Sequence, residues 1–286
     1  MMPNRREMKK CSYCGKEYPD EEVRCSIDHE PLIGGESQPI PPILPVPEAA
    51  PTPSPAKALT DRQMRIIEVV LVCAITLGPS ILASFHYLSA NATGSYGGSE
   101  YRWFYNIVRE GSGLALLWYV LTRSGRTFGS LGLSWKGADV GWSLLLYLIG
   151  TTTFYTVYSI IYYTGLTSVD LKTGSNQVGY YLFGNGLFIT TMLFQLVNPF
   201  FEELIVRAYV MTEVRQLTNS VGKAVFVSVA LQTSYHLYQG VPAALSHAAE
   251  FLIYSIFYAK TNRIAPVLLA HLYLDVGSTL FYCLRH

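Results

Sequence analysis

The sequence predicts an all-α polytopic membrane protein of about seven to eight transmembrane helices, preceded by a small zinc ribbon on a proline-rich linker. Of its 286 residues, 50% are hydrophobic and only 14% are charged, and the mean hydropathy is +0.25. Soluble domains typically carry about 25% charged residues. Apolar runs recur after residue 60, whereas most of the cysteines and prolines precede it. The net charge of +1, without a long basic face, indicates that nucleic acid is not a partner.

The N-terminal segment, residues 1–35, has the spacing of a metal-binding ribbon. A CxxC pair is followed, after ten intervening residues, by a second Cys-x-x-Asp pair. Two such pairs are typical of a zinc ribbon, in which four S, N or O ligands close a tetrahedral site. Zinc would supply most of the folding energy of so short a segment; the alternatives are an unstructured tail or a redox pair. The expected ligands of this structural zinc are Cys11, Cys14, Cys25 and Asp28, with His29 as the alternative fourth ligand.

Residues 36–60 are a linker, because proline is too frequent there for a packed helix and favours an extended spacer. Residues 61–286 are the expected transmembrane domain. Its apolar runs approach or reach the roughly 20 residues needed for one crossing. These runs are Ile66–Leu88, Trp103–Leu121, Val140–Tyr163, Leu182–Phe201, Ala224–Leu237, Ala244–Ala259 and Ile264–Leu284.

The distribution of Lys and Arg predicts the orientation. Basic residues follow the second, fourth and sixth apolar runs, whereas the opposite loops contain only Arg102 and Lys172. Short basic loops face the cytoplasm. We therefore expect an integral membrane protein, embedded in the lipid bilayer, with a cytoplasmic N-terminus.

The stretch Asn198–Arg207 places two adjacent carboxylates and an arginine at the end of the fourth run. An ionisable residue at the centre of a membrane helix costs about 2.5–3.5 kcal/mol on insertion scales, which makes a functional site the default hypothesis. Glu203 and Arg207 have the spacing of a helical ion pair, so a structural and a functional role both stay open for them. Glu202 has no such partner and is the main candidate. A helix that begins at Leu182 would place Glu202 about 30 Å along it, near the cytoplasmic face.

Three predicted helices each carry one polar line at helical spacing, which apolar packing alone does not require. The lines are Thr191, Gln195, Asn198 and Glu202; Ser228, Gln232 and His236; and His271 and Asp275.

These groups suit hydrolysis, because a carboxylate can take a proton from water. The histidines could hold the water, stabilise an oxyanion or bind a metal ion. Asp275 is expected to accept a hydrogen bond from the ring of His271 and so fix its tautomer. His247 and Glu250 are a rival pair, for which we expect a gating or outer-rim role.

The motifs resemble those of the CPBP intramembrane protease family, the CAAX-protease and bacteriocin-processing group. The resemblance covers about residues 180–280. A Glu-Glu-x-x-x-Arg motif, a His near the end of the next apolar segment and a His-x-x-x-Asp motif follow in the family's order. The second motif usually reads Phe-x-x-x-His, and Gln232 stands in place of the Phe. The matching residues are Glu202, Glu203, Arg207, His236, His271 and Asp275.

The resemblance implies an endopeptidase that cuts peptide or protein substrates, membrane-associated or C-terminal and CAAX-like, near the cytoplasmic leaflet. It implies that Glu202 is the general base, that His236, His271 and Asp275 surround the water or oxyanion, and that the other two residues brace the site. The family is commonly called metalloprotease, and a metal-free mechanism has also been argued, so an active-site metal stays open. The N-terminal segment resembles ribbons of bacterial membrane proteins, which implies the bacterial inner membrane.

Two other functions are compatible with the sequence. One is a catalytically silent relative that acts as a scaffold, immunity or partner-binding protein and keeps the motifs for helix packing. The other is a small transporter or proton relay, since intramembrane Glu, His and Asp also mark ion pathways. Seven crossings without evident internal repeats argue against the transporter.

Overall fold

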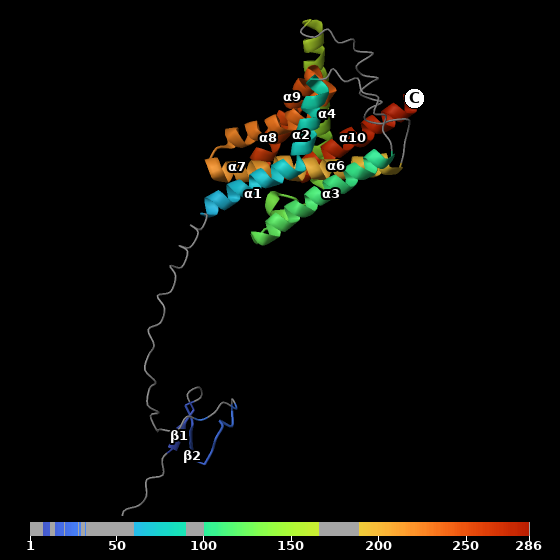
Figure 1. Ribbon diagram of the computed structural model, residues 1–286. Coiled ribbons are helices and arrows are strands. Elements are labelled where there is room, and N and C mark those ends of the chain that lie inside the picture. Colours follow the sequence, from blue (N-terminus) through green and yellow to red (C-terminus); the bar gives the residue numbers. More distant parts are fainter. Residues whose placement is uncertain are drawn as a thin grey trace, which may run out of the picture. The chain divides into compact units, whose positions relative to one another are not determined.

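The computed structural model describes residues 8–11, 15–19, 21–27, 29, 32, 60–89, 100–165 and 189–285 (Figure 1). The chain forms two compact units, residues 1–58 and 59–286. The predicted 36–60 linker lies almost wholly outside the described residues.

The first unit contains a two-stranded antiparallel hairpin, β1 (Met8–Lys10) and β2 (Glu17–Pro19). Cys11 and Cys25 share its small core with Tyr18 and Leu32. The hydroxyl of Tyr18 lies 3.1 Å from the sulfur of Cys25. The two other expected zinc ligands, Cys14 and Asp28, lie outside the described residues, so the zinc ribbon stays a prediction.

The described part of the second unit is helical, which agrees with the predicted all-α class. Its helices are α1 (Asp61–Thr76), α2 (Gly78–Ser89), α3 (Glu100–Arg123), η1 (Phe128–Leu131), α4 (Ala138–Tyr163), α6 (Ile189–Glu202), η2 (Glu203–Val210), α7 (Met211–Thr218), α8 (Val221–His236), η3 (Leu237–Gln239), α9 (Val241–Thr261) and α10 (Ala265–Arg285).

The first predicted apolar run is two helices rather than one. α1 begins at a capping box in which the Thr60 hydroxyl accepts from Gln63 N–H, and the chain then bends by 51° between α1 and α2. The bend has a local cause: Pro79 has no backbone N–H, and its ring clashes with the carbonyl four residues earlier.

The fourth run continues much further than its apolar composition indicates. α6, η2 and α7 form one 30-residue helical stretch, Ile189–Thr218, with a π-helical middle. The helix therefore extends beyond the apolar run that ends at Phe201. The helix continues because the charges of Glu203 and Arg207 are paired inside the protein, not in the headgroups. Glu202 consequently lies near the middle of a long helix.

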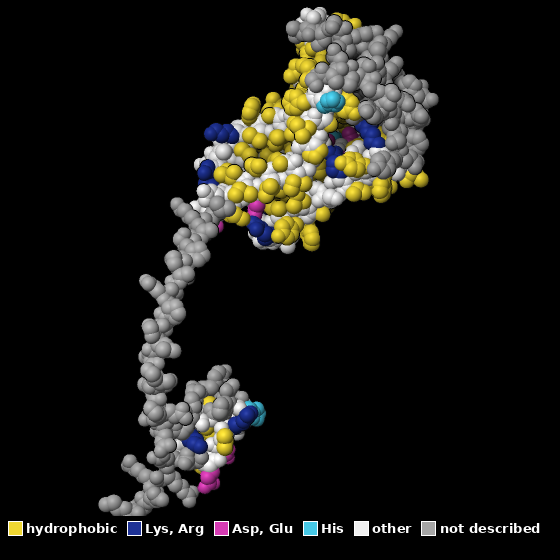
Figure 2. Space-filling view, viewed as in Figure 1, with side chains coloured by type: hydrophobic (Ala, Val, Ile, Leu, Met, Phe, Trp, Pro, Cys, Tyr) yellow, Lys and Arg dark blue, Asp and Glu magenta, His cyan; other side chains and the backbone are white. Residues whose placement is uncertain are grey.

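Two described helices, Ala138–Tyr163 and Ile189–Thr218, are long and apolar enough to cross a membrane, and the bent α1–α2 pair is a third if it forms one span. α4 turns apolar residues such as Leu144 and Leu148 outward, and hydrophobic side chains cover much of the visible face of this unit (Figure 2). These helices support an integral membrane protein. The count of seven to eight crossings stays a prediction.

Packing around η2 positions the site. All eight residues of η2 are buried. Helices α8 and α9 pack against η2, and α3 and α10 pack against the preceding α6. α3 lies so close to α6 that a Cβ added to Gly113 would be 2.6 Å from Cε2 of Phe201. Four helices thus converge on the residues before and after position 202.

Candidate active site

The Glu203–Arg207 pair forms the base of the candidate site. Both side chains are completely buried and form the predicted i, i+4 ion pair. Arg207 also donates to the amide oxygen of Gln232 and, at 3.4 Å, to Ser255 Oγ. The second oxygen of Glu203 faces His271. Two buried charges are tolerated here because each has several polar partners.

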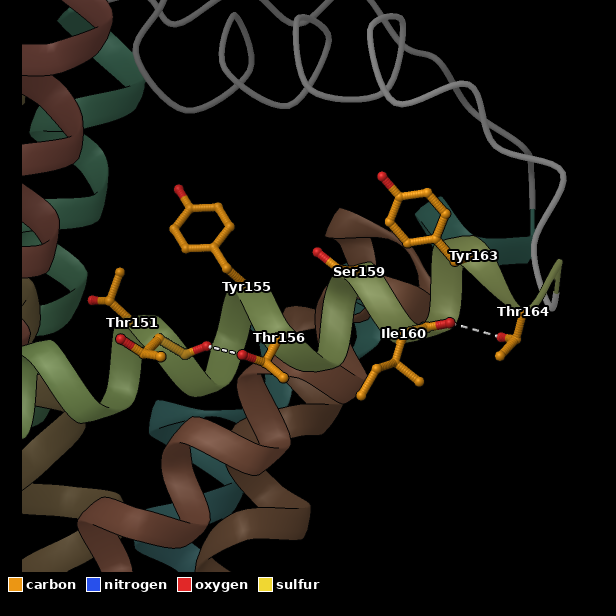
Figure 3. A pocket seen from close by; sticks show the side chains of 8 residues that line it. Thr151, Tyr155, Thr156, Ser159, Ile160, Tyr163 and Thr164 are labelled. Atoms are coloured by element: carbon orange, nitrogen blue, oxygen red, sulfur yellow. Dashed lines mark hydrogen bonds between the residues drawn. The ribbon is translucent and has the colours of Figure 1, made fainter.

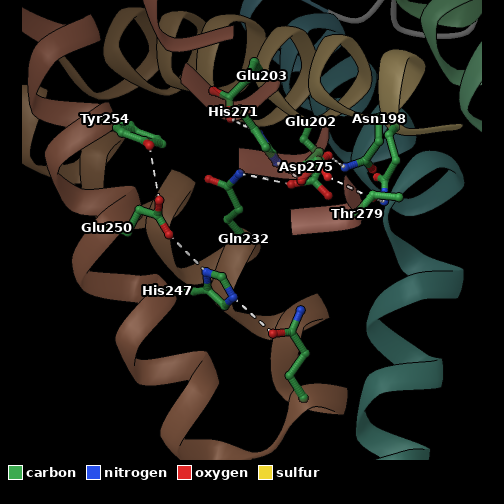
Figure 4. A network of polar contacts seen from close by, with 12 residues as sticks. Asn198, Glu202, Glu203, Gln232, His247, Glu250, Tyr254, His271, Asp275 and Thr279 are labelled. Carbon is green, nitrogen blue, oxygen red and sulfur yellow. Dashed lines mark hydrogen bonds and ion pairs between the residues drawn. The ribbon is translucent and has the colours of Figure 1, made fainter. Parts of the chain in front are cut away.

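Glu202 lies one residue before this pair and is 7% exposed. Its Oε2 atom accepts from the Tyr235 hydroxyl at 2.9 Å and from Nε2 of Gln232 at 3.2 Å. Gln232 therefore links Glu202 to Arg207. Its amide nitrogen donates to Glu202 (Figure 4), while its amide oxygen accepts from Arg207.

Glu203, and not Asp275, orients His271. Nδ1 of His271 lies 2.8 Å from Oε1 of Glu203, whereas Nε2 lies 3.6 Å from Oδ1 of Asp275, which is longer than a hydrogen bond. The predicted hydrogen bond from the ring to Asp275 is thus absent. Asp275 instead accepts from Nδ2 of Asn198 at 3.0 Å. The Glu203 carboxylate, which is paired with Arg207, accepts a hydrogen bond from Nδ1–H of His271, so Nε2 is the ring nitrogen left for chemistry.

His236 ends α8 and is held in a comparable way. Its Nδ1 lies 2.8 Å from the backbone carbonyl of Gln232. A carbonyl only accepts, so Nδ1 carries the proton and Nε2 has the lone pair. Glu202 interacts electrostatically with both His236 and His271. The structure therefore brings the six predicted residues together.

Some polar residues at the site were not predicted. Tyr235 precedes His236 directly, so its position gave no helical-spacing signal. Glu110 on α3 is 1% exposed, receives a hydrogen bond from Arg109 at 3.0 Å and interacts electrostatically with Glu202 and Asp275. Its place within a mainly apolar run, next to Arg109, was the available signal.

His247 and Glu250 lie next to this cluster. Their side chains are 3.2 Å apart, and the rings of His247 and His236 have centroids 5.0 Å apart. Figure 4 shows the pair on the side of Gln232 away from Asp275.

A separate open pocket of about 770 Å³ follows one face of α4 (Figure 3). Hydroxyl groups line it, among them those of Thr151, Thr156 and Ser159, and it contains none of the six residues above. We do not assign the site chemistry to it.

Within the described ranges, no three His, Cys, Asp or Glu side chains gather closely enough to hold a metal ion. The chemistry below is written with protein groups alone.

The fold and the site together define an α-helical integral membrane protein with a buried cluster of carboxylates and imidazoles. Residues 184–277 match a family model described as Type II CAAX prenyl endopeptidase Rce1-like. The matched region contains all six residues of the cluster, and it supports a protease. It covers roughly one third of the chain and leaves α1 to α4 unmatched. No curated protein and no solved structure matches the chain.

Proposed function

We propose that the protein is an intramembrane endopeptidase in which Glu202 activates the attacking water. The environment of Glu202 carries the proposal. Both protein donors reach Oε2, and among the described residues no hydrogen bond reaches Oε1, which can then accept from a water. Two imidazole rings from other helices lie within electrostatic reach of this carboxylate. A base, a water position and imidazole nitrogens without protein hydrogen bonds are what amide hydrolysis needs.

The reaction follows from these positions. Glu202 takes a proton from the water, and the resulting hydroxide attacks the carbonyl carbon of the peptide bond. The carbon–nitrogen bond then breaks, the proton on Glu202 passes to the departing amine, and the hydroxide oxygen stays in the new carboxyl group. We assign Nε2 of His236 to holding the water. We propose that His271 stabilises the oxyanion, because Asp275 lies close enough to compensate a positive charge on the His271 ring.

The substrate class that we propose is a membrane-associated peptide or a C-terminal, CAAX-like peptide. The similarity of residues 184–277 to the CAAX prenyl endopeptidase family supports this choice. The burial of the site in an apolar helical body supports it as well, because a substrate that partitions into the bilayer reaches such a site directly.

Cleavage assays in liposomes test the proposal. The reconstituted protein is incubated with a peptide that ends in a prenylated CAAX sequence, with the same peptide lacking the lipid, and with a hydrophobic transmembrane peptide. We expect defined fragments of at least one membrane-bound peptide in mass spectrometry. If the folded protein leaves all three peptides intact, the catalytically silent scaffold becomes the better account.

For the N-terminal unit we propose a structural zinc ribbon on the cytoplasmic side of a bacterial inner membrane. The support is the ligand spacing, the common core of Cys11 and Cys25, and the basic loops after every second apolar run. We further propose that this unit captures substrates or partners for the membrane domain.

A further inference from the structure

A second acid–imidazole pair lies on α9, and the reaction described above does not use it (Figure 4). Nδ1 of His247 is 3.2 Å from Oε2 of Glu250, and the hydroxyl of Tyr254 donates to Oε1 of Glu250 at 3.1 Å. Glu250 is only 1% exposed. Its negative charge is therefore shielded from solvent and needs a positive partner.

The contacts of His247 indicate that it supplies this positive charge. Its Nε2 atom lies 3.0 Å from Oε1 of Gln239, while the amide nitrogen of Gln239 donates to the Tyr238 hydroxyl at 3.0 Å. Both ring nitrogens of His247 thus face acceptor oxygens, one on Gln239 and one on Glu250. A neutral imidazole has one N–H, and only the imidazolium donates from both nitrogens.

This cation lies against His236, with ring centroids 5.0 Å apart. Nδ1 of His236 already carries a proton, so a proton on its Nε2 would place a second cation beside His247. Like charges at this separation disfavour such a double cation. The other rings around His247 are the uncharged Phe154 and Phe251, at centroid distances of 4.5 and 5.4 Å.

The remaining charges near the pair come from three other helices. Glu202 in α6 acts on His236 in the opposite sense, because its negative charge favours a protonated ring. Arg207 in η2 and His271 in α10 interact electrostatically with Glu250. His247 is thus the cation whose ring contacts that of His236.

We propose that His247, held as an imidazolium by Glu250, is a positioning residue that keeps His236 neutral during catalysis. The role rests on the proposed hydrolysis, in which Nε2 of His236 accepts a hydrogen bond from the water. Without the charge on His247, Glu202 draws a proton onto His236 at a higher pH. The ring then no longer accepts from the water.

The acid limb of the pH–rate profile tests this role in the full-length protein. In His247→Gln we expect the limb to move up by about two to three pH units, as Coulomb's law gives for unit charges at this ring separation and an effective dielectric constant of about 20. His247→Lys retains the charge and should keep the wild-type limb. His86→Gln, on the exposed face of α2, is the matched control. A merely structural role lowers the rate at every pH and leaves the limb in place.

A second readout is independent of cleavage. Nuclear magnetic resonance of the histidine-labelled full-length protein in nanodiscs reports the protonation of each ring. We expect two protonated nitrogens on His247 at neutral pH, and a higher titration midpoint for His236 in His247→Gln. A neutral His247 in the wild type, or an unchanged acid limb in an active His247→Gln, overturns the proposal. If no cleavage occurs but the resonances are as expected, the proposed protease function is refuted and the charged His247–Glu250 pair is not.

Discussion

Gln232 is the residue at which this chain departs from the expected motif, and replacing it tests how the site is held together. The side chain is completely buried. Its amide oxygen accepts from Arg207 and its nitrogen donates to Glu202, at 3.2 Å for the latter contact. In Gln232→Leu the volume is nearly kept and both hydrogen bonds are lost. In Gln232→Phe, which restores the usual family residue, both are lost as well.

The magnitude follows from the charges involved. A hydrogen bond to a charged group contributes about 1.5–3 kcal/mol, so the two bonds together contribute up to roughly 3–6 kcal/mol. Glu202 keeps its bond from Tyr235, and Arg207 keeps Glu203 and Ser255. We therefore expect a loss near the lower end, about 3 kcal/mol. For a domain of this size, that lowers the melting temperature by roughly 6–12 °C.

Thermal unfolding of the purified variants in nanodiscs, followed by circular dichroism, measures the effect. Gln216→Leu on the exposed face of α7 makes the same chemical change. Its amide accepts from Arg65, but this contact is exposed, so water replaces it and the variant should melt within about 2 °C of the wild type. If Gln232→Leu melts like this control, the amide does not bridge the two charges, and the description of the site is wrong.

Three further predictions concern other parts of the chain. Glu203→Gln leaves the Arg207 charge buried and unpaired, so it should destabilise the protein by about 3–5 kcal/mol, measured by the same melts; a near-wild-type melt would contradict the buried pair. Elemental analysis should find one zinc per full-length chain and none in Cys25→Ser or in residues 59–286 alone. Full-length protein without zinc would refute the predicted zinc ribbon. A thiol reagent that does not cross membranes should label the N-terminal unit of zinc-stripped protein in inside-out vesicles and not in intact cells, and the reverse result would invert the orientation.

Much of the site was visible in the sequence because helical spacing determines which residues share a face. The line Gln195, Asn198 and Glu202 does face its neighbours, with Gln195 donating to Thr279 at 2.8 Å and Asn198 donating to Asp275. The spacing of Glu203 and Arg207 also identified their ion pair correctly.

Contacts between different helices could not be predicted from helical spacing. Asp275 has the right spacing to reach His271 on its own helix, yet Glu203 on another helix is closer and orients the ring. Tertiary packing brought that carboxylate within 2.8 Å, and no sequence periodicity reports such a distance. The same applies to Gln232, whose two partners both come from the α6–η2 stretch.

The end of the fourth apolar run did not give the end of the helix, for a related reason. The fourth run looked complete at Phe201 because charges follow it, and charges normally mark the end of a membrane helix. In the folded protein these charges are paired in the interior, and the helix continues to Thr218. The bend at Pro79, by contrast, had a local signal in the sequence.

The cleavage rate of Glu202→Gln tests the central claim most directly. The variant keeps the shape of the side chain but removes the base, so we expect a fall of about 10²–10⁴-fold in kcat with an unchanged melting temperature. Glu68→Gln, an equivalent change on α1, should cleave like the wild type. Equal rates for Glu202→Gln and Glu68→Gln on the same membrane-bound peptide would contradict a role of Glu202 as the general base.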